Sequence, residues 1–303
     1  MRKIIAVCFA VMFVFAGNMS AENISVPGSP LAIDGDYVVG SYIDSFGVQS
    51  YIYNRLTKDW VAVAKDGTNG IYATDISGNN VVGYFYDLDW GCYGFRYDRA
   101  TKDWETLPAP VGAAYTYVCS ISGNDIAGNY EDDVLGDSHG FIYNLTSGYG
   151  SLTPFTGDLI GATNLALNNI DGNRLVGQCQ NSSGEYHGCF FDGTIWNTLD
   201  IGTTTTNLWC INGDHIVGTY TSGAVSAGFD YDITTETWIS LSVPGATHTE
   251  VSGLYNGDYI GWYFDSSGNS HNFIGEIPVP EPSTLALLTI ALIAGTFFFL
   301  RKR

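Results

Sequence analysis

A paired-glycine pattern recurs six times in this chain and constrains its fold more than any other feature. In each copy a glycine lies within or next to a Ser, Asn or Asp turn, a short apolar run follows, and a second glycine ends the run. The second glycines are Gly40, Gly83, Gly128, Gly177, Gly218 and Gly261, spaced 41 to 49 residues apart. A period of this length with several short strands per copy indicates the blades of a β-propeller.

The residues after each second glycine predict the strands of the unit. An aromatic strand such as Phe95-Arg96-Tyr97 leads into a polar turn, and an aromatic and an aliphatic residue follow, as at Trp104 and Leu107. Val, Ile, Tyr, Phe and Trp favour strands, whereas Gly with Asn or Asp favours tight hairpins. No part of this region has a sustained helical period. We therefore predict an all-β fold with four antiparallel strands per unit.

The repeats resemble known extracellular repeats. A Tyr-Asp-x-x-Thr-x-x-Trp step is similar to kelch repeats but lacks their double glycine. HAF-type repeats are closer, and the matching segments are Ser138-His139-Gly140-Phe141, Tyr186-His187-Gly188-Cys189, Ser270-His271-Asn272-Phe273 and Val243-Pro244-Gly245-Ala246. This resemblance implies an exported propeller and carries no agreed biochemical activity.

The two ends of the repeat array are complementary. The sixth unit stops at Ile277-Pro278 before its fourth strand, whereas Ile24-Ser25-Val26-Pro27-Gly28 matches Leu241-Ser242-Val243-Pro244-Gly245 of the fifth unit. We predict a six-bladed ring whose last blade takes its outer strand from the N-terminus, with Ile24 buried. Such closure removes an exposed sheet edge. A five-bladed ring with a loose end is the alternative.

The C-terminus predicts a sorting signal. Val279-Pro280-Glu281-Pro282 precedes an apolar run from Leu285 to Leu300, and Arg301, Lys302 and Arg303 end the chain. The run is slightly shorter than the roughly 20 residues of a comfortable transmembrane helix, and terminal cations stop such a helix on the cytoplasmic side. The three parts resemble the PEP-CTERM signal of Gram-negative bacteria. That resemblance implies processing by an exosortase and a link to exopolysaccharide; an ordinary C-terminal anchor is the alternative.

The N-terminus predicts export. Arg2 and Lys3 precede the apolar stretch 4–15, as in a secretory signal peptide. Cleavage is expected after Ala21. The alternatives are cleavage after Ala16 and an uncleaved N-terminal anchor. The expected organisation is a signal peptide at 1–21, a propeller at 22–278, a linker at 279–284, and a transmembrane helix with its basic tail at 285–303. The protein is expected to be anchored in the inner membrane and, after processing, to reach the cell surface or matrix.

Charge excludes one class of partner. Between residues 22 and 281 lie seven cations and all 31 acids, a net charge of −24, compared with −19 for the whole chain. This negative field repels phosphate backbones, so we expect no nucleic-acid binding.

The cysteines and acids offer few sites. Cys179 and Cys189 replace aromatic residues within one hairpin, which indicates a disulfide between them; two buried thiols are the alternative. Asp132, Asp133 and Asp137 are weak candidates for a Ca²⁺ site, but their spacing does not match an EF-hand loop. We expect no catalytic residue, no metal and no cofactor.

Three functions remain open from the sequence. The first is a non-enzymatic surface or matrix scaffold that binds exopolysaccharide, for which aromatic side chains would supply stacking surfaces. The second is a glycan hydrolase or lyase, since the spacing of carboxylate pairs is set by the fold and is not visible in a sequence. The third is a structural matrix protein without a specific ligand.

Overall fold

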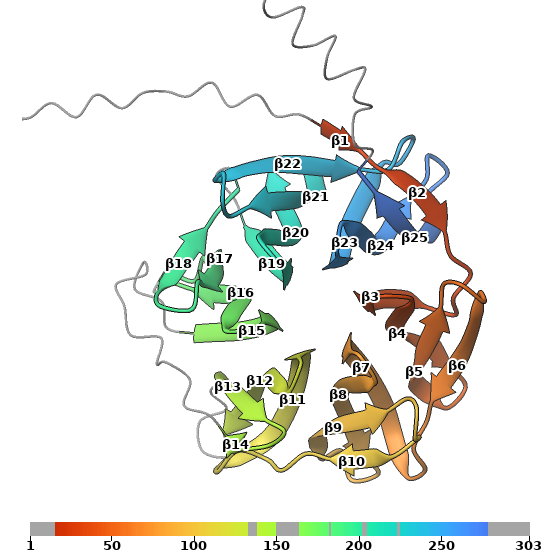
Figure 1. The fold of residues 1–303 in the computed structure, drawn as a ribbon, viewed down its shortest axis with the longest axis vertical. Coiled ribbons are helices and arrows are strands. Elements are labelled where there is room, and N and C mark those ends of the chain that lie inside the picture. Colours follow the sequence, from red (N-terminus) through yellow and green to blue (C-terminus); the bar gives the residue numbers. More distant parts are fainter. Residues whose placement is uncertain are drawn as a thin grey trace, which may run out of the picture.

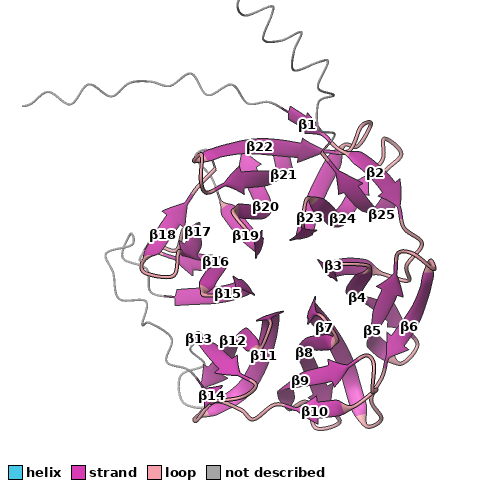
Figure 2. Cartoon of the chain, viewed as in Figure 1, coloured by secondary structure: helices cyan, strands magenta, loops and turns pink. Residues whose placement is uncertain are grey.

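The computed structural model describes residues 16–132, 138–149, 164–181, 183–201, 205–222 and 225–277. All regular structure in these ranges is β-strand, as Figure 2 shows. The strands form small antiparallel units arranged around a common centre (Figure 1). The predicted all-β class is confirmed.

Three units make up the first half of the ring. The first contains β3 (Ser29–Asp34), β4 (Tyr37–Asp44), β5 (Gly47–Asn54) and β6 (Asp59–Val63). The second contains β7 (Thr68–Ser77), β8 (Asn80–Asp87), β9 (Cys92–Asp98) and β10 (Trp104–Thr106). The third contains β11 (Ala113–Ser122), β12 (Asp125–Asp132), β13 (Ser138–Asn144) and β14 (Gly148–Tyr149).

The remaining units follow the same order. One contains β15 (Asn164–Asp171), β16 (Arg174–Gln180), β17 (Tyr186–Phe191) and β18 (Trp196–Leu199). The next contains β19 (Thr206–Asn212), β20 (His215–Ser222), β21 (Val225–Asp232) and β22 (Thr237–Ser242). The last contains β23 (His248–Tyr255), β24 (Asp258–Phe264) and β25 (Ser270–Glu276). In every unit the first strand lies at the centre of the ring (Figure 1).

The N-terminal segment lies against the last two units. β1 (Ala16–Asn18) runs parallel to β22, and β2 (Ser20–Asn23) pairs antiparallel with β25. Met19 between them is 2% exposed, and its N–H donates to Ser242 O at 3.0 Å. The expected signal-peptide boundary after Ala21 therefore falls inside β2.

The strand beside β25 begins earlier than the sequence match indicates. It ends at Asn23, although the Ile24 N–H still donates to Asn272 O at 3.0 Å. Ile24 is 7% exposed and packs with Ile33, Val38 and Tyr51. Beyond Ile24 the chain bends at Pro27 and Gly28 and enters β3.

The hydrophobic core lies between neighbouring units. Within each unit, the close approach of the first two strands explains the second glycine of the repeat. A Cβ at Gly83 would stand 1.9 Å from Tyr72 O, and one at Gly177 would stand 2.1 Å from Ala166 O. Only glycine allows the first two strands of a unit to approach this closely. Beside such a glycine, Trp104 stacks on Phe95 with ring centroids 4.3 Å apart.

Side chains at the ends of the inner strands link successive units. In five of the six units, the polar residue that ends this strand accepts a hydrogen bond from the backbone N–H of the turn that follows the next inner strand. Among the described residues the acceptors are Asp34, Ser77, Ser122, Asp171 and Asn212, and the donors are Gly78, Gly123, Gly172, Gly213 and Asn256. These five inter-unit bonds stabilise the ring and give the Ser, Asn and Asp residues of the repeat a role beyond the hairpin turn.

Candidate functional site

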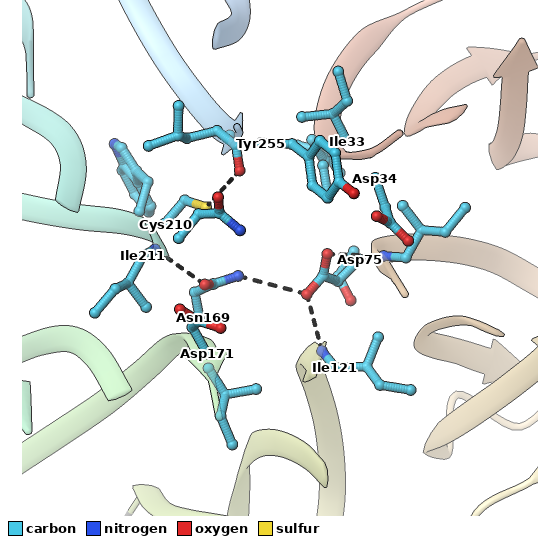
Figure 3. Close-up of a pocket in the computed structure, with 18 of the residues that line it drawn as sticks. Ile33, Asp34, Asp75, Ile121, Asn169, Asp171, Cys210, Ile211 and Tyr255 are labelled. Carbon is cyan, nitrogen blue, oxygen red and sulfur yellow. Dashed lines mark hydrogen bonds between the residues drawn. The ribbon is translucent and has the colours of Figure 1, made fainter. Parts of the chain in front are cut away.

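A polar cavity of about 140 Å³ lies at the centre of the ring. Its walls are the ends of the inner strands, and Figure 3 shows side chains from several units converging on it. Asp34, Asp75 and Asp171 contribute three carboxylates, and Asn169, Cys210 and Tyr255 contribute other polar groups. The cavity thus combines residues more than 200 positions apart in the sequence.

Asp75 is the most perturbed acid of this cavity. Its side chain accepts hydrogen bonds from the N–H groups of Ile76 at 2.8 Å and Ile121 at 2.9 Å, and from the Ser120 hydroxyl. Burial nevertheless raises the pKa of its carboxyl to about 6, and the charge of Asp34 acts in the same direction. Desolvation outweighs the hydrogen bonds, because a buried carboxylate loses more hydration than its donors return.

Asn169 continues this network into the next units. Its Nδ2 donates to Ser120 Oγ at 2.9 Å, and its Oδ1 accepts the Ile211 N–H at 3.1 Å. Asp75, Ser120 and Asn169 occupy the same repeat position, two residues before the end of the inner strand. Sequence reasoning missed them, although polar residues inside an otherwise apolar run were a usable signal.

The cysteines of the cavity are poor nucleophiles. Burial raises the pKa of the Cys119 and Cys210 thiols to about 12, so both are neutral at pH 7. Reactive cysteines need the opposite shift, toward a stable thiolate.

A second candidate is a group of aromatic rings in continuous contact on the second and third units. We define the aromatic surface as Tyr72, Tyr84, Tyr86, Trp90 and Tyr117. Tyr72 stacks on Tyr84 with centroids 4.8 Å apart, and Tyr84 contacts Tyr117 edge-on at 5.3 Å. Tyr86 touches Tyr72 at 6.0 Å and Trp90 at 6.1 Å. The tyrosines are half-buried, whereas Trp90 is 65% exposed, so the cluster opens to solvent at the tryptophan.

The cysteine pair named from the sequence lies in one hairpin. Cys179 on β16 and Cys189 on β17 are joined by a disulfide, with their Cα atoms 6.0 Å apart. This spacing is within the ordinary range for a disulfide. The bridge occupies two positions where other units carry aromatic residues.

One of the three acids named from the sequence lies within the described residues. Asp132 belongs to β12 and lies 3.3 Å from His139 Nε2. Asp133 and Asp137 lie outside the described residues. Within the described ranges, no three His, Cys, Asp or Glu side chains are grouped as a metal site requires.

The repeat histidines pair with acids. His187 Nδ1 lies 2.8 Å from Asp200, and His271 Nε2 lies 2.9 Å from Asp265. Together with the His139–Asp132 contact, these pairs account for the histidines that recur in the repeats.

The terminal elements named from the sequence lie outside the described residues. These are Val279, Pro280, Glu281 and Pro282, the helix expected at 285–303, and Arg301, Lys302 and Arg303. In the part of the chain that the structure does describe, no helix is long and apolar enough to cross a membrane.

Solved structures similar to this chain include TolB, a β-propeller domain and a protease. TolB from Acinetobacter baumannii superposes with a TM-score of 0.57 at 12% identity, covering 80% of this chain and 65% of that one, just under two thirds of its length. The β-propeller domain of the Trilobed protease from Pyrococcus furiosus gives 0.52 at 9% identity, covering 88% and 97%. The tricorn protease gives 0.54 at 11% identity, covering 84% and 27%. At these identities the likeness shows a propeller-like fold alone. No curated protein matches the chain by sequence.

One family model matches, and it covers the C-terminal tail. Residues 278–303 match the PEP-CTERM protein-sorting motif. This match confirms the resemblance drawn from the Pro-Glu-Pro sequence, the apolar run and the basic end. It implies export, anchoring in the membrane and processing by an exosortase, and the chain therefore joins a propeller-like β-fold to a PEP-CTERM sorting tail.

Proposed function

We propose that this protein is a non-enzymatic scaffold of the cell surface or extracellular matrix that binds exopolysaccharide. In this proposal the strand units form a six-bladed ring, β2 supplies the outer strand of the sixth blade, and an exosortase removes the tail. The observation that carries it is the combination of a PEP-CTERM tail with an exposed aromatic surface on an all-β scaffold.

The pairings of β2 support the closed ring. β2 occupies beside β25 the place that β22 occupies beside β21 in the preceding unit. The last unit thereby gains a fourth strand, and the unpaired edge of β25 is covered.

The hydrogen bonds of the cavity carboxylates favour a scaffold function over an enzymatic one. Asp34, Asp75 and Asp171 each accept a backbone N–H from the next unit, and Asp75 accepts a second one from Ile76 in its own strand. Carboxylates used in this way stabilise the contacts between units, whereas glycoside cleavage requires one carboxyl group to give up a proton and another to attack or activate water.

Binding to purified exopolysaccharide from the producing cells tests the proposal. The exported domain is run through native gels with and without the polysaccharide, and reducing ends and unsaturated sugars are measured after prolonged incubation. Retardation without product formation is expected. Product formation would instead support a hydrolase or lyase, and unchanged mobility in every polysaccharide gel would favour a structural matrix protein without a ligand.

A further inference from the structure

The loop between β8 and β9 presents Trp90 in an unusual backbone conformation. Trp90 has φ of 67°, in the left-handed region, and its indole is 65% exposed. Left-handed backbone is costly for a residue with a Cβ, and for a bulky side chain it is a genuine outlier. The loop is held by Asp87, whose Oδ1 accepts the N–H groups of Asp89 at 2.9 Å and Gly91 at 2.8 Å.

The same loop occurs twice more among the described residues. In the β16–β17 loop, Asn181 Oδ1 accepts the N–H groups of Ser183 and Glu185, both at 2.9 Å. In the β24–β25 loop, Asp265 Oδ1 accepts those of Ser267 at 2.8 Å and Asn269 at 2.9 Å. The backbone bonds also correspond, since Trp90, Gly184 and Gly268 each donate to the residue that holds the loop, at 3.1, 3.0 and 3.0 Å.

Trp90 therefore stands where its two structural equivalents are glycine. Gly184 and Gly268 have φ of 84° and 83°, which glycine adopts without steric cost. The loop needs no side chain at this place in order to close. Strained backbone at an exposed aromatic is the kind of outlier from which a functional role is inferred, because folding alone would favour glycine.

We propose that Trp90 is the stacking platform of a binding site for a neutral polysaccharide, with the four tyrosines of the aromatic surface as its extension toward the centre of the ring. The inference rests on the proposed function and names the site that performs it. The indole offers a flat apolar face to the C–H face of a sugar ring. The Tyr86 ring contacts the indole in a tilted arrangement, with ring centroids 6.1 Å apart.

The polar groups around this surface fit sugar hydroxyls. Asp89 is exposed beside Trp90, and Glu131 acts electrostatically on Tyr117 at the other end of the cluster. Carboxylates accept hydrogen bonds from hydroxyl groups, and these bonds are stronger than those between neutral groups. The same carboxylates, within a domain of net charge −24, repel an acidic polymer. The surface therefore favours an uncharged glycan.

Three variants test the site. Trp90→Gly installs the residue of the equivalent loops, so the protein should fold with an undiminished melting temperature while it loses the indole. Leu56→Ala removes a similarly exposed apolar side chain, 71% exposed, from the β5–β6 turn at the other end of the strands. Gly184→Trp places an indole in the matching loop, where Gln180 replaces Tyr86, and should lower the melting temperature.

Binding is measured by isothermal titration and gel retardation with the purified exopolysaccharide, a neutral β-glucan, a galactomannan and the acidic polysaccharide alginate as probes. We expect Trp90→Gly to weaken binding about tenfold or more and Leu56→Ala to leave it unchanged. Bound glycan should also protect part of the tryptophan fluorescence from acrylamide in the unaltered protein, and this protection should be absent in Trp90→Gly.

The outcomes separate the two proposals. Unaltered affinity in a folded Trp90→Gly variant would overturn the site while leaving polysaccharide binding in place. Binding of none of the probes by the unaltered protein would overturn both. A preference for alginate over the two neutral polysaccharides would overturn the assignment of a neutral glycan.

Discussion

Replacing Ile24 tests whether the N-terminal segment is an integral part of the ring. Its side chain is 7% exposed and lies in a cluster with Ile33, Val38, Tyr51 and Ile260. Truncating a buried isoleucine to alanine costs about 2 to 5 kcal/mol, and a carboxylate at the same place adds the cost of an unpaired buried charge. For a domain of this size each kcal/mol lowers the melting temperature by about 2 to 4 °C. Ile24→Asp should therefore melt at least about 10 °C lower than the unaltered protein.

Ser25→Asp is the matched control, because this neighbouring side chain is exposed. It introduces the same charge one residue away, and surface substitutions of this kind usually change stability by less than about 0.5 kcal/mol. Thermal unfolding followed by circular dichroism, with urea titrations at 25 °C, compares the two variants. Equal melting temperatures would show that residues 20–28 do not contribute to the core, and the closed six-bladed ring would have to be abandoned.

Four further outcomes are expected. A chain that begins at Glu22 lacks the buried Met19 and half of β2, so its unfolding free energy should be about 2 kcal/mol or more below that of a chain that begins at Gly17. Mass spectrometry of the exported protein should accordingly place its N-terminus at or before Gly17. Unreduced, denatured protein should show two fewer alkylatable thiols than reduced protein, because Cys179 and Cys189 are bridged. Asp75 keeps its proton up to about pH 6 in the folded protein but only up to about pH 4 in the unfolded chain. The unfolding free energy should therefore fall by about 3 kcal/mol as the pH rises from about 4 to about 6, and urea titrations should show a smaller fall for Asp75→Asn. Glu281→Ala should leave the anchored form intact and block its processing. Mass spectrometry should then find the uncleaved C-terminus of this variant in exosortase-positive cells.

The fold could be predicted where its determinants are local. The turn glycines are an example, since Gly35 and Gly78 have φ of 57° and 58° in two-residue hairpins. The burial of Ile24 also followed from the sequence, because its match to Leu241 carries a buried position from one unit to another.

The cavity and the aromatic surface could not be predicted in the same way. Asp75 meets Asn169 only because the ring brings β7 and β15 together across the centre, and no sequence spacing records that distance. Trp90 reads as an ordinary loop aromatic until its φ and its glycine equivalents are known. The start of β2 was misjudged for a different reason, since a secretory signal and a sheet strand adjoin in the same short segment.

The place of β25 has a mechanical consequence for a protein tethered by its C-terminus. The sorting tail begins just after Glu276, so any pull on the tether enters the fold through this strand. β25 is paired along its length with β24 and, near its end, with β2. Force along the strand loads both ladders in shear, and several hydrogen bonds must then break together instead of one after another. The pairing of β2 with β25, which brings the two terminal segments together, therefore also resists a force applied to the anchored protein.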